Sequence, residues 1–186
     1  MKTDQGWILS YSGRKVFPLD PRPEDFSIAV VAHALSLKCR YNGHCEFFYS
    51  VAYHSILVSQ HVEPRHALIG LLHELDEVFL PDVPRPIKPF LRGWKAIAER
   101  NMIAGCQAFG IEYPFPEQVH YVDAQMLNTE KEILMPDSEP WEGLPPKLDL
   151  TLSFLYPKEV EDAFVSRYRE IVGESDNPYF QLDRIP

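Results

Sequence analysis

Apolar residues recur along most of this chain at the three-to-four-residue spacing of an α-helix. The pattern is clearest over residues 26–39, where one helical face carries Ile28, Val31, Ala32, Leu35 and Cys39. Further helices are predicted at about 50–62, 65–78, 91–109, 116–134 and 158–172. Strand-type patterns are confined to residues 7–17, which are typical of a hairpin turning at Ser12-Gly13. The sequence therefore predicts an all-α helical bundle with a small N-terminal β-hairpin.

Prolines separate several of these helical segments. Four prolines fall within residues 80–89, so this segment is predicted to be a stiff connector and not a helix. Residues 135–157 are also rich in proline and are predicted to be irregular. With 186 residues, of which 45% are hydrophobic, the chain is long enough for a substantial core. We therefore expect a single domain over residues 1–186.

Charge and cysteine content limit the classes of partner. The formal net charge is −9, so no nucleic-acid polymer is expected to bind, because its phosphates would be repelled. A small phosphorylated substrate needs only a few cations and a metal ion, and is not excluded. Three cysteines without metal-type spacing indicate reduced thiols. Residues 1–6 open no apolar run and no stretch approaches membrane-spanning length, so we expect a cytoplasmic protein without a membrane partner.

Four residues of metal-binding type lie on segments that are predicted to be helical. They are two histidines and two carboxylates, namely His54, the adjacent pair His73 and Glu74, and Asp123. Each lies in an apolar stretch, where an uncompensated polar or charged group is costly to bury. A divalent cation such as Mn, Co, Zn or Mg would compensate these groups. We therefore predict one divalent metal ion held by these four side chains.

Two further carboxylates lie close to this set in the sequence. In an α-helix, Glu77 would share a face with His73, while Glu74 would lie about 100° around the axis. Glu77 could then orient a metal ligand or a water molecule. Asp82 follows in the stiff proline connector. Because a carboxylate near a metal can accept the proton of an attacking water, Asp82 is the best candidate for this role.

Taken together and in order, these motifs closely resemble those of the HD-domain phosphohydrolases. The similarity rests on Ser50-Val51-Ala52-Tyr53-His54-Ser55, Leu72-His73-Glu74-Leu75-Asp76-Glu77, Pro81-Asp82-Val83-Pro84-Arg85-Pro86-Ile87-Lys88 and Val122-Asp123. It covers about residues 7–135 and is most similar to small bacterial and phage proteins related to 5′-deoxynucleotidases. Phage dATP triphosphohydrolases are more distantly similar. The resemblance implies an all-helical bundle with a metal at its centre.

The resemblance also implies a metal-ligand set, a catalytic carboxylate pair and an arginine that contacts phosphate. The implied metal ligands are His54, His73, Glu74 and Asp123. The implied catalytic carboxylates are Glu77 and Asp82, and the implied phosphate-contacting arginine is Arg40. The family carries an aspartate where this chain has Glu74. Glutamate is an equally good oxygen donor but is one methylene longer, so the metal or the helix would have to shift.

Four residues are candidates for binding substrate. His44 either lines the pocket or caps the Asn42-Gly43 turn, and the sequence favours neither. Without the family resemblance, Arg40 is equally well explained as a cation at a helix C-terminus. Arg85 and Lys88 are second-ranked phosphate ligands, because proline-rich connectors often carry exposed charges.

The remaining histidines and nearby charges are predicted to have no role in the site. His33 has an apolar context but no partner spacing, so a packing role is favoured. Glu130 and Glu132, on either side of Lys131, are predicted to form a charged solvent face.

The favoured interpretation is a divalent-metal-dependent phosphohydrolase that acts on a small-molecule deoxynucleotide. It would release phosphate from a dNMP or triphosphate from a dNTP such as dATP, and the sequence does not separate these reactions. The rival is a non-catalytic nucleotide-binding or interaction module whose metal site is weakened by Glu74. Base preference, the native metal and the choice between monomer and homo-oligomer stay open.

Overall fold

A computed structural model describes residues 6–136 and 138–173. The helices are α1 (Ile28–Ser36), α2 (Val51–His61), α3 (Ala67–Leu72), α4 (Trp94–Phe109), α5 (Glu117–Leu134) and α6 (Pro157–Val172). Short 3₁₀ helices are η1 (Pro23–Asp25), η2 (Arg40–Gly43), η3 (Pro64–His66), η4 (Leu75–Val78) and η5 (Lys88–Phe90). The strands β1 (Ile8–Leu9) and β2 (Lys15–Val16) pair antiparallel, with Ile8 opposite Val16 and Leu9 opposite Lys15. The predicted all-α fold with an N-terminal hairpin is confirmed.

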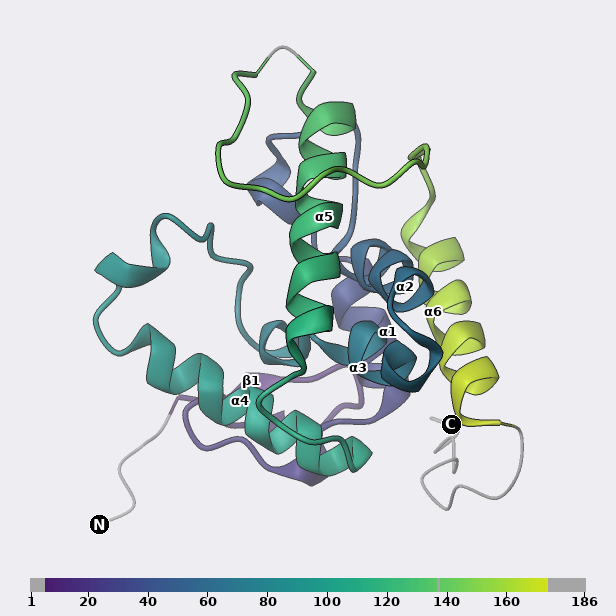
Figure 1. Ribbon diagram of the computed structural model, residues 1–186. Helices are drawn as coiled ribbons and strands as arrows, with labels where there is room; N and C mark the ends of the chain where they lie inside the picture. The colour runs from purple at the N-terminus through teal and green to yellow at the C-terminus, as the bar shows by residue number, and fades with distance from the viewer. Residues whose placement is uncertain (1–5, 137, 174–186) are drawn as a thin grey trace.

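Helix α2 is the central element of the bundle. It begins at Ser50, whose hydroxyl accepts a hydrogen bond from the backbone N–H of Tyr53, and it packs against α1, α3, α5 and α6. Figure 1 shows these helices gathered around it. Because other helices meet α2 on most of its surface, Val51, His54 and Val58 are all fully buried. A polar ring at position 54 therefore lies in the interior, where it requires partners.

Two groups of buried apolar side chains hold the helices together. The larger joins α1, α2, α3, α4 and α6, and includes Phe26, Val31, Leu35, Leu71, Leu72, Leu75 and Phe164. The smaller lies between α2 and α5 and consists of Val58, Val62, Val119, Val122 and Met126. This second group fixes α5 beside α2, and it thereby sets Asp123 next to the centre of the bundle.

Helix α3 packs closely against α2 at Gly70. A Cβ at this position would lie 3.0 Å from the Cα of Ser59 and 3.1 Å from the Cγ2 of Val62. Since the nearest atom belongs to the backbone of α2, a side chain at position 70 would force the helices apart. The close approach lets His73, directly after α3, reach His54 on α2.

We expect Gly70→Ala to destabilise the fold and to weaken any metal binding at the bundle centre. Overpacking of this kind costs about 1–3 kcal/mol of unfolding free energy. Urea unfolding and metal titration of the same preparation would measure both effects. Gly6→Ala is the matched control, because a Cβ at Gly6 would meet nothing within 4 Å. Wild-type stability in Gly70→Ala would contradict the close packing described above.

The third helix ends earlier than the sequence predicted. A continuous helix over 65–78 was expected, but α3 ends at Leu72, the pair His73-Glu74 forms a turn, and η4 follows. The side chain of His73 bonds the carbonyl of Gly70, and the N–H of Glu77 bonds the carbonyl of Glu74, three residues back in each case. These bonds tighten the backbone, so the predicted α-helical relation between His73, Glu74 and Glu77 is wrong.

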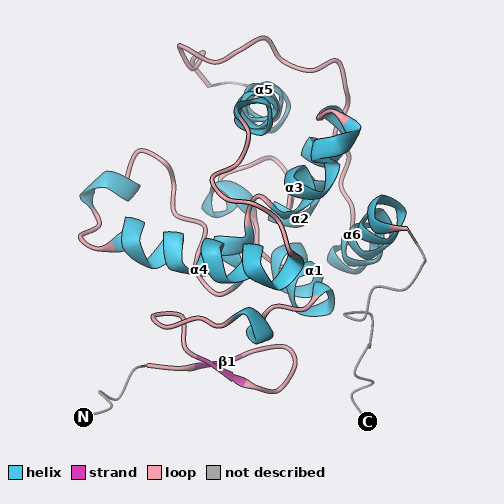
Figure 2. Ribbon diagram, turned by 60° about the horizontal axis from the view of Figure 1, so that its bottom comes forward, coloured by secondary structure: helices cyan, strands magenta, loops and turns pink. Residues whose placement is uncertain are grey.

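The proline connector and the segment after α5 are both long and irregular. In Figure 1 the connector extends to the left of α5, while the segment after α5 arches over its upper end and crosses it toward α6. The N-terminal hairpin lies at the opposite end, beneath α4 in Figure 2. None of the described helices combines the length and apolar character needed to span a membrane. The prediction of one domain extends beyond the described residues and stays a prediction.

Candidate metal centre

The four predicted metal ligands come together at one point. His54 lies on α2, His73 and Glu74 in the turn after α3, and Asp123 on α5. One nitrogen or oxygen of each lies within 4.8 Å of the others. His54 Nε2 is 3.1 Å from both His73 Nε2 and Asp123 Oδ1, while Glu74 Oε1 is 3.7 Å from His73 Nε2. Atoms that bind one ion at about 2.0–2.2 Å lie up to about 4.4 Å apart, so the three measured spacings of 3.1, 3.1 and 3.7 Å fit a single ion.

In each of the two imidazole rings, Nδ1 points away from the cluster and Nε2 points toward it. The hydrogen bond that Nδ1 makes bears on whether Nε2 can bind a metal. His54 Nδ1 lies 2.5 Å from Glu130 Oε1, and His73 Nδ1 lies 2.8 Å from the carbonyl oxygen of Gly70. An ionised carboxylate and a carbonyl can only accept hydrogen bonds, so both Nδ1 atoms carry a proton and donate. When an ion is bound, each ring would be neutral and would direct the lone pair of Nε2 toward the cluster, as metal-binding histidines do.

Charge at this point favours a cation. Burial raises the pKa of Asp123, but hydrogen bonds from His54 and His73 hold it well below its usual range. Burial and the Arg40 guanidinium lower the pKa of His54, but Glu130 and Asp123 outweigh them and raise it to about 9. The surroundings therefore stabilise positive charge between the two rings. Two imidazole nitrogens and two carboxylate oxygens form a donor set that suits a divalent transition metal.

A buried carboxylate on α5 supports both this cluster and the pocket beside it. Glu130 has no exposed surface and accepts hydrogen bonds from His54 Nδ1, Arg40 Nε at 3.1 Å and Tyr49 Oη at 2.9 Å. The hydroxyl of Tyr41 donates to the same carboxylate. Burial raises the pKa of Glu130, but Arg40 and His54 lower it to about 2. Glu130 is therefore an ionised acceptor that fixes His54 and Arg40 together.

The prediction of a charged solvent face at Glu130 and Glu132 is wrong for Glu130. Glu132 is exposed, whereas Glu130 lies on the inner face of α5. The sequence does carry a signal for this, since Val119, Val122, Met126 and Glu130 follow one another at spacings of three or four residues. A carboxylate that continues an apolar stripe is a candidate for a buried partner of a cation.

Arg40 lies between the metal-ligand cluster and the pocket. It begins η2, after an extended Cys39, so it is not the C-terminal cation of α1, which ends at Ser36. Besides Glu130, its guanidinium pairs with Glu74 through Nη1 and Oε1 at 3.3 Å. Arg40 is buried, yet it lines the pocket.

The proline connector brings charged residues to the same pocket. Lys88 Nζ lies 3.8 Å from Glu77 Oε1, and Arg85 Nη2 lies 3.7 Å from Asp123 Oδ2. Glu77 is buried, and its Oε2 has no hydrogen-bond partner among the described residues. Burial, with the nearby carboxylates of Glu74 and Asp82, raises the pKa of Glu77.

Lys38 holds the start of the connector in place. Its Nζ donates hydrogen bonds to the backbone carbonyls of Glu77 and, at 2.6 Å, of Leu80. Burial lowers the pKa of Lys38, while Glu77 and Asp82 oppose this change. Sequence reasoning gave Lys38 no role, because its partners are backbone atoms about forty residues away.

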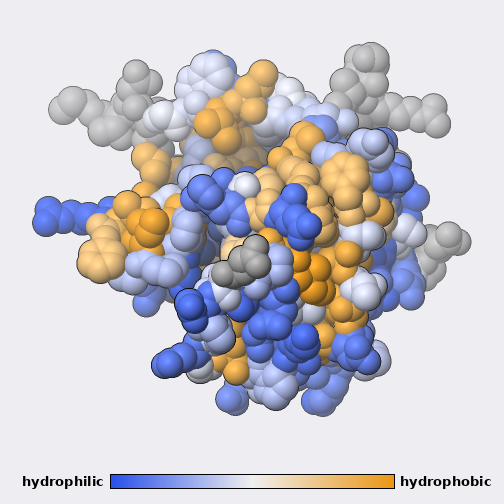
Figure 3. Space-filling model, turned by 90° about the horizontal axis from the view of Figure 1, so that it is seen from above, coloured by the Kyte–Doolittle hydropathy of each residue, from blue (hydrophilic) through white to orange (hydrophobic). Residues whose placement is uncertain are grey.

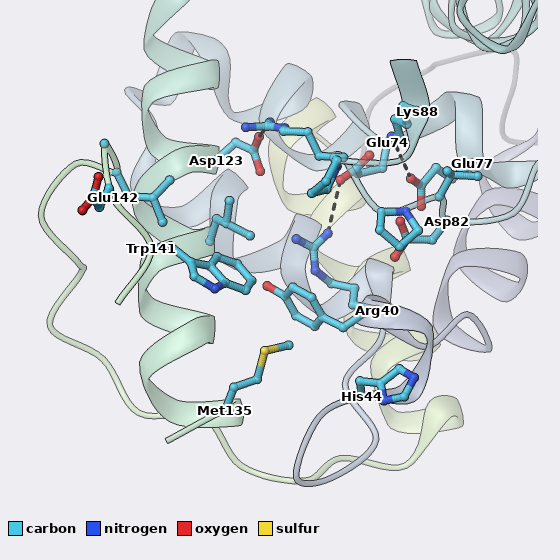
Figure 4. Close-up of a pocket in the computed structure, with 18 residues that line it drawn as sticks. Arg40, His44, Glu74, Glu77, Asp82, Lys88, Asp123, Met135, Trp141 and Glu142 are labelled. Atoms are coloured by element: carbon cyan, nitrogen blue, oxygen red, sulfur yellow. Dashed lines mark hydrogen bonds and ion pairs between the residues drawn. The ribbon is translucent and has the colours of Figure 1, made fainter. Parts of the chain in front are cut away.

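A pocket of about 760 Å³ opens over these groups. All four predicted substrate-binding residues, Arg40, His44, Arg85 and Lys88, line it, together with both predicted catalytic residues, Glu77 and Asp82. Figure 4 shows the carboxylates of Glu74, Glu77 and Asp82 on one side, and Trp141 and Met135 across Arg40 on the other. His44 is exposed and lies at the margin in this view, apart from the carboxylates. The sequence did not predict the lining residues Tyr41, Leu127, Met135, Trp141 and Leu144.

Comparison with known proteins places the chain in a family. It is 30% identical over 169 residues to the uncharacterized protein YfdR of Escherichia coli K12, an alignment that covers 89% of this chain and 95% of YfdR. The chain belongs to the YfdR family. An uncharacterized protein of Rhodobacter capsulatus is 32% identical to this chain over 125 residues, which cover 62% of this chain and 64% of that protein. No protein-family model matches the chain. The names of these two relatives specify no reaction.

Proposed function

We propose that this member of the YfdR family is an HD-domain phosphohydrolase that depends on a divalent metal and acts on deoxynucleotides. The observation that carries the proposal is the convergence of His54, His73, Glu74 and Asp123 at the edge of a pocket. The same pocket holds three more carboxylates, Glu77, Asp82 and Glu142, and three cationic side chains. This combination suits a substrate with an anionic phosphate and a reaction that moves protons.

The four converging side chains would hold the ion, and their chemistry fits it. Both imidazole rings are oriented by outer hydrogen bonds, and the two carboxylates supply the negative charge that a divalent cation requires. When bound, such an ion neutralises charge on phosphate oxygens and makes water a stronger nucleophile. Mn, Co, Zn and Mg are all compatible with nitrogen and oxygen donors.

The cationic residues would bind the phosphate. Arg40 is held rigidly by Glu130, and its planar guanidinium can contact two phosphate oxygens. Lys88 and the exposed Arg85 approach from the connector, where they already lie near the carboxylates of Glu77 and Asp123. An incoming phosphate would compete with these carboxylates for the two cations.

The carboxylates of Asp82 and Glu77 would manage protons. In the hydrolysis, water adds to phosphorus, the phosphorus–oxygen bond to the leaving group breaks, and Asp82 accepts the proton of the attacking water. Glu77, close to Lys88, would position that cation or exchange a proton with the leaving oxygen. Both side chains line the pocket, as this role requires.

The test combines metal analysis with a substrate screen. We expect mass spectrometry of the purified protein to find about one divalent ion per chain. With added Mn or Co, a panel of dNMPs and dNTPs should yield phosphate or triphosphate, resolved by chromatography. Absence of metal together with absence of any released product would refute the proposal.

The Arg40–Glu74 ion pair supports a second candidate, a non-catalytic nucleotide-binding module. Because Arg40 lies 3.3 Å from Glu74, part of the negative charge in the cluster is balanced without a metal. Such a module would bind deoxynucleotides in the pocket and release no product. Binding without turnover, in protein that contains no metal, would favour this candidate over the hydrolase.

Asp82→Asn should retain metal and lose turnover. The amide cannot accept a proton from water, and general-base catalysis contributes about 10²–10⁴-fold to rate. Phosphate release under saturating Mn and metal content by mass spectrometry are the two measurements. Asp20→Asn is the control, because Asp20 is exposed and does not line the pocket. An unchanged kcat in Asp82→Asn would remove Asp82 from the mechanism.

A further inference from the structure

The pocket has two chemically different halves. Near the cluster it is lined mainly by charged side chains, and away from it mainly by aromatic and aliphatic ones, namely Tyr41, Leu127, Met135, Trp141 and Leu144, with Glu142 next to Trp141. Viewed from above, the surface is hollowed between the connector on the left and the segment after α5, with apolar atoms beside the hollow (Figure 3). The apolar half is therefore continuous with the half that would receive a phosphate.

The two aromatic rings in the apolar half do not stack on each other. The ring centroids of Tyr41 and Trp141 lie 6.4 Å apart at an interplanar angle of 58°. Trp141 keeps 40% of its surface exposed, although it lies against the pocket. A planar ligand could thus contact the face of Trp141 without displacing a protein partner from that ring.

Tyr41 is held in place by an unusual backbone conformation. Tyr41 and Asn42 have φ values of 56° and 52°, in the left-handed region that side-chain-bearing residues rarely adopt. The hydroxyl of Tyr41 bonds the buried Glu130, and its ring lies 5.3 Å from the Arg40 guanidinium. Strain of this kind persists where surrounding contacts over-determine it, and it concentrates in binding sites.

The segment that carries Trp141 is fixed along α5 by several hydrogen bonds. Asn128 Nδ2 donates to the carbonyl of Pro145, Thr129 Oγ1 accepts from the N–H of Leu148, and Lys131 Nζ donates to the carbonyl of Ser138. These hydrogen bonds lie both before and after Trp141 in the sequence, so they hold its indole ring over the pocket.

We propose that Trp141, with Tyr41 and Met135 beside it, binds the nucleobase of a nucleoside phosphate by stacking. The inference rests on the proposed function for the phosphate end of the pocket. A volume of about 760 Å³ is within the range of small-ligand sites. The residues of the apolar half offer mainly ring faces and aliphatic carbons, and stacking tolerates every base. The pocket therefore accepts purine and pyrimidine nucleotides, with purines bound more tightly because their rings are larger.

The test compares dAMP with 2-deoxyribose 5-phosphate, which has the sugar and phosphate but no base. Both affinities are measured calorimetrically in EDTA, so that no metal-dependent turnover depletes the ligand. Stacking on one aromatic residue corresponds to about a 5- to 150-fold gain in affinity. We expect wild-type protein to prefer dAMP by a factor of this size, Trp141→Ala to lose the preference, and Trp141→Phe to keep most of it. Trp7→Ala is the control, since Trp7 lies on the hairpin outside the pocket.

The outcomes separate this inference from the proposed reaction. An equal affinity for the two ligands in wild-type protein, or an unchanged preference in Trp141→Ala, overturns the stacking site even if deoxynucleotides are hydrolysed. A preference that depends on Trp141, in a protein that releases no product with any metal, supports the stacking site and refutes the hydrolase.

Discussion

Glu130→Ala is expected to lower the free energy of unfolding by about 3–5 kcal/mol, the typical effect of removing one partner from a buried ion pair. The truncation leaves the guanidinium of Arg40 without its fully buried carboxylate, and it removes the acceptor of His54, Tyr41 and Tyr49. Urea unfolding in EDTA measures this loss without any contribution from a metal.

Glu132→Ala is the matched control for that measurement. It removes the same side chain two residues away, where the carboxylate is exposed and pairs with Lys131 and Lys147. Its effect should stay within about 0.5 kcal/mol, as for most surface substitutions. Equal effects of the two variants would mean that Glu130 does not support a buried network.

The more conservative Glu130→Gln separates stability from the orientation of the ligands. An amide keeps the shape, but its NH₂ group faces a donor wherever it replaces a carboxylate oxygen. Loss of an outer hydrogen bond to a metal-binding histidine weakens metal binding by about 10- to 100-fold. Mn or Co titration of the folded variant should show a loss of this size.

His73→Ala should lower the affinity for a divalent metal below the detection limit of a titration while leaving the protein folded. It removes one of four donor atoms, so the loss of affinity should exceed the 10- to 100-fold expected for an outer partner. Phosphate release should fall to background in the same preparation if the proposed hydrolase reaction is correct. Isothermal titration with Mn or Co, and metal content after purification, are the measurements.

His33→Ala is the control for this ligand deletion. His33 is half-buried, stacks on Tyr11 with the ring centroids 3.5 Å apart and pairs with Glu161 at 3.0 Å, but it lies outside the cluster. Its removal should leave metal affinity unchanged. Undiminished metal binding in His73→Ala would show that the ion is held elsewhere or not at all.

The positions of five of the helices and the identity of the converging ligands follow from the sequence by itself. Helical periodicity is a local property, so α1, α2, α4, α5 and α6 lie where the apolar spacing predicts them. The proline connector and the hairpin are also predicted from local sequence, because proline restricts and glycine widens the allowed backbone dihedral angles at their own positions. The order and spacing of two histidines and two carboxylates predicted His54, His73, Glu74 and Asp123 as ligands. The fold brings their donor atoms within 4.8 Å of one another.

Only the tertiary structure decides what surrounds those ligands. Glu130 meets His54 and Arg40 across 76 and 90 residues, and such pairings depend on how α5 packs on α2, which no local pattern encodes. The turn at His73-Glu74 likewise replaces a predicted helix, because a side-chain bond to Gly70 and tight packing at that glycine outweigh helical propensity. Trp141 enters the pocket through hydrogen bonds between an irregular segment and α5. Long-range packing thus decides which charged and aromatic side chains are buried or face the pocket, since burial is a property of the whole fold.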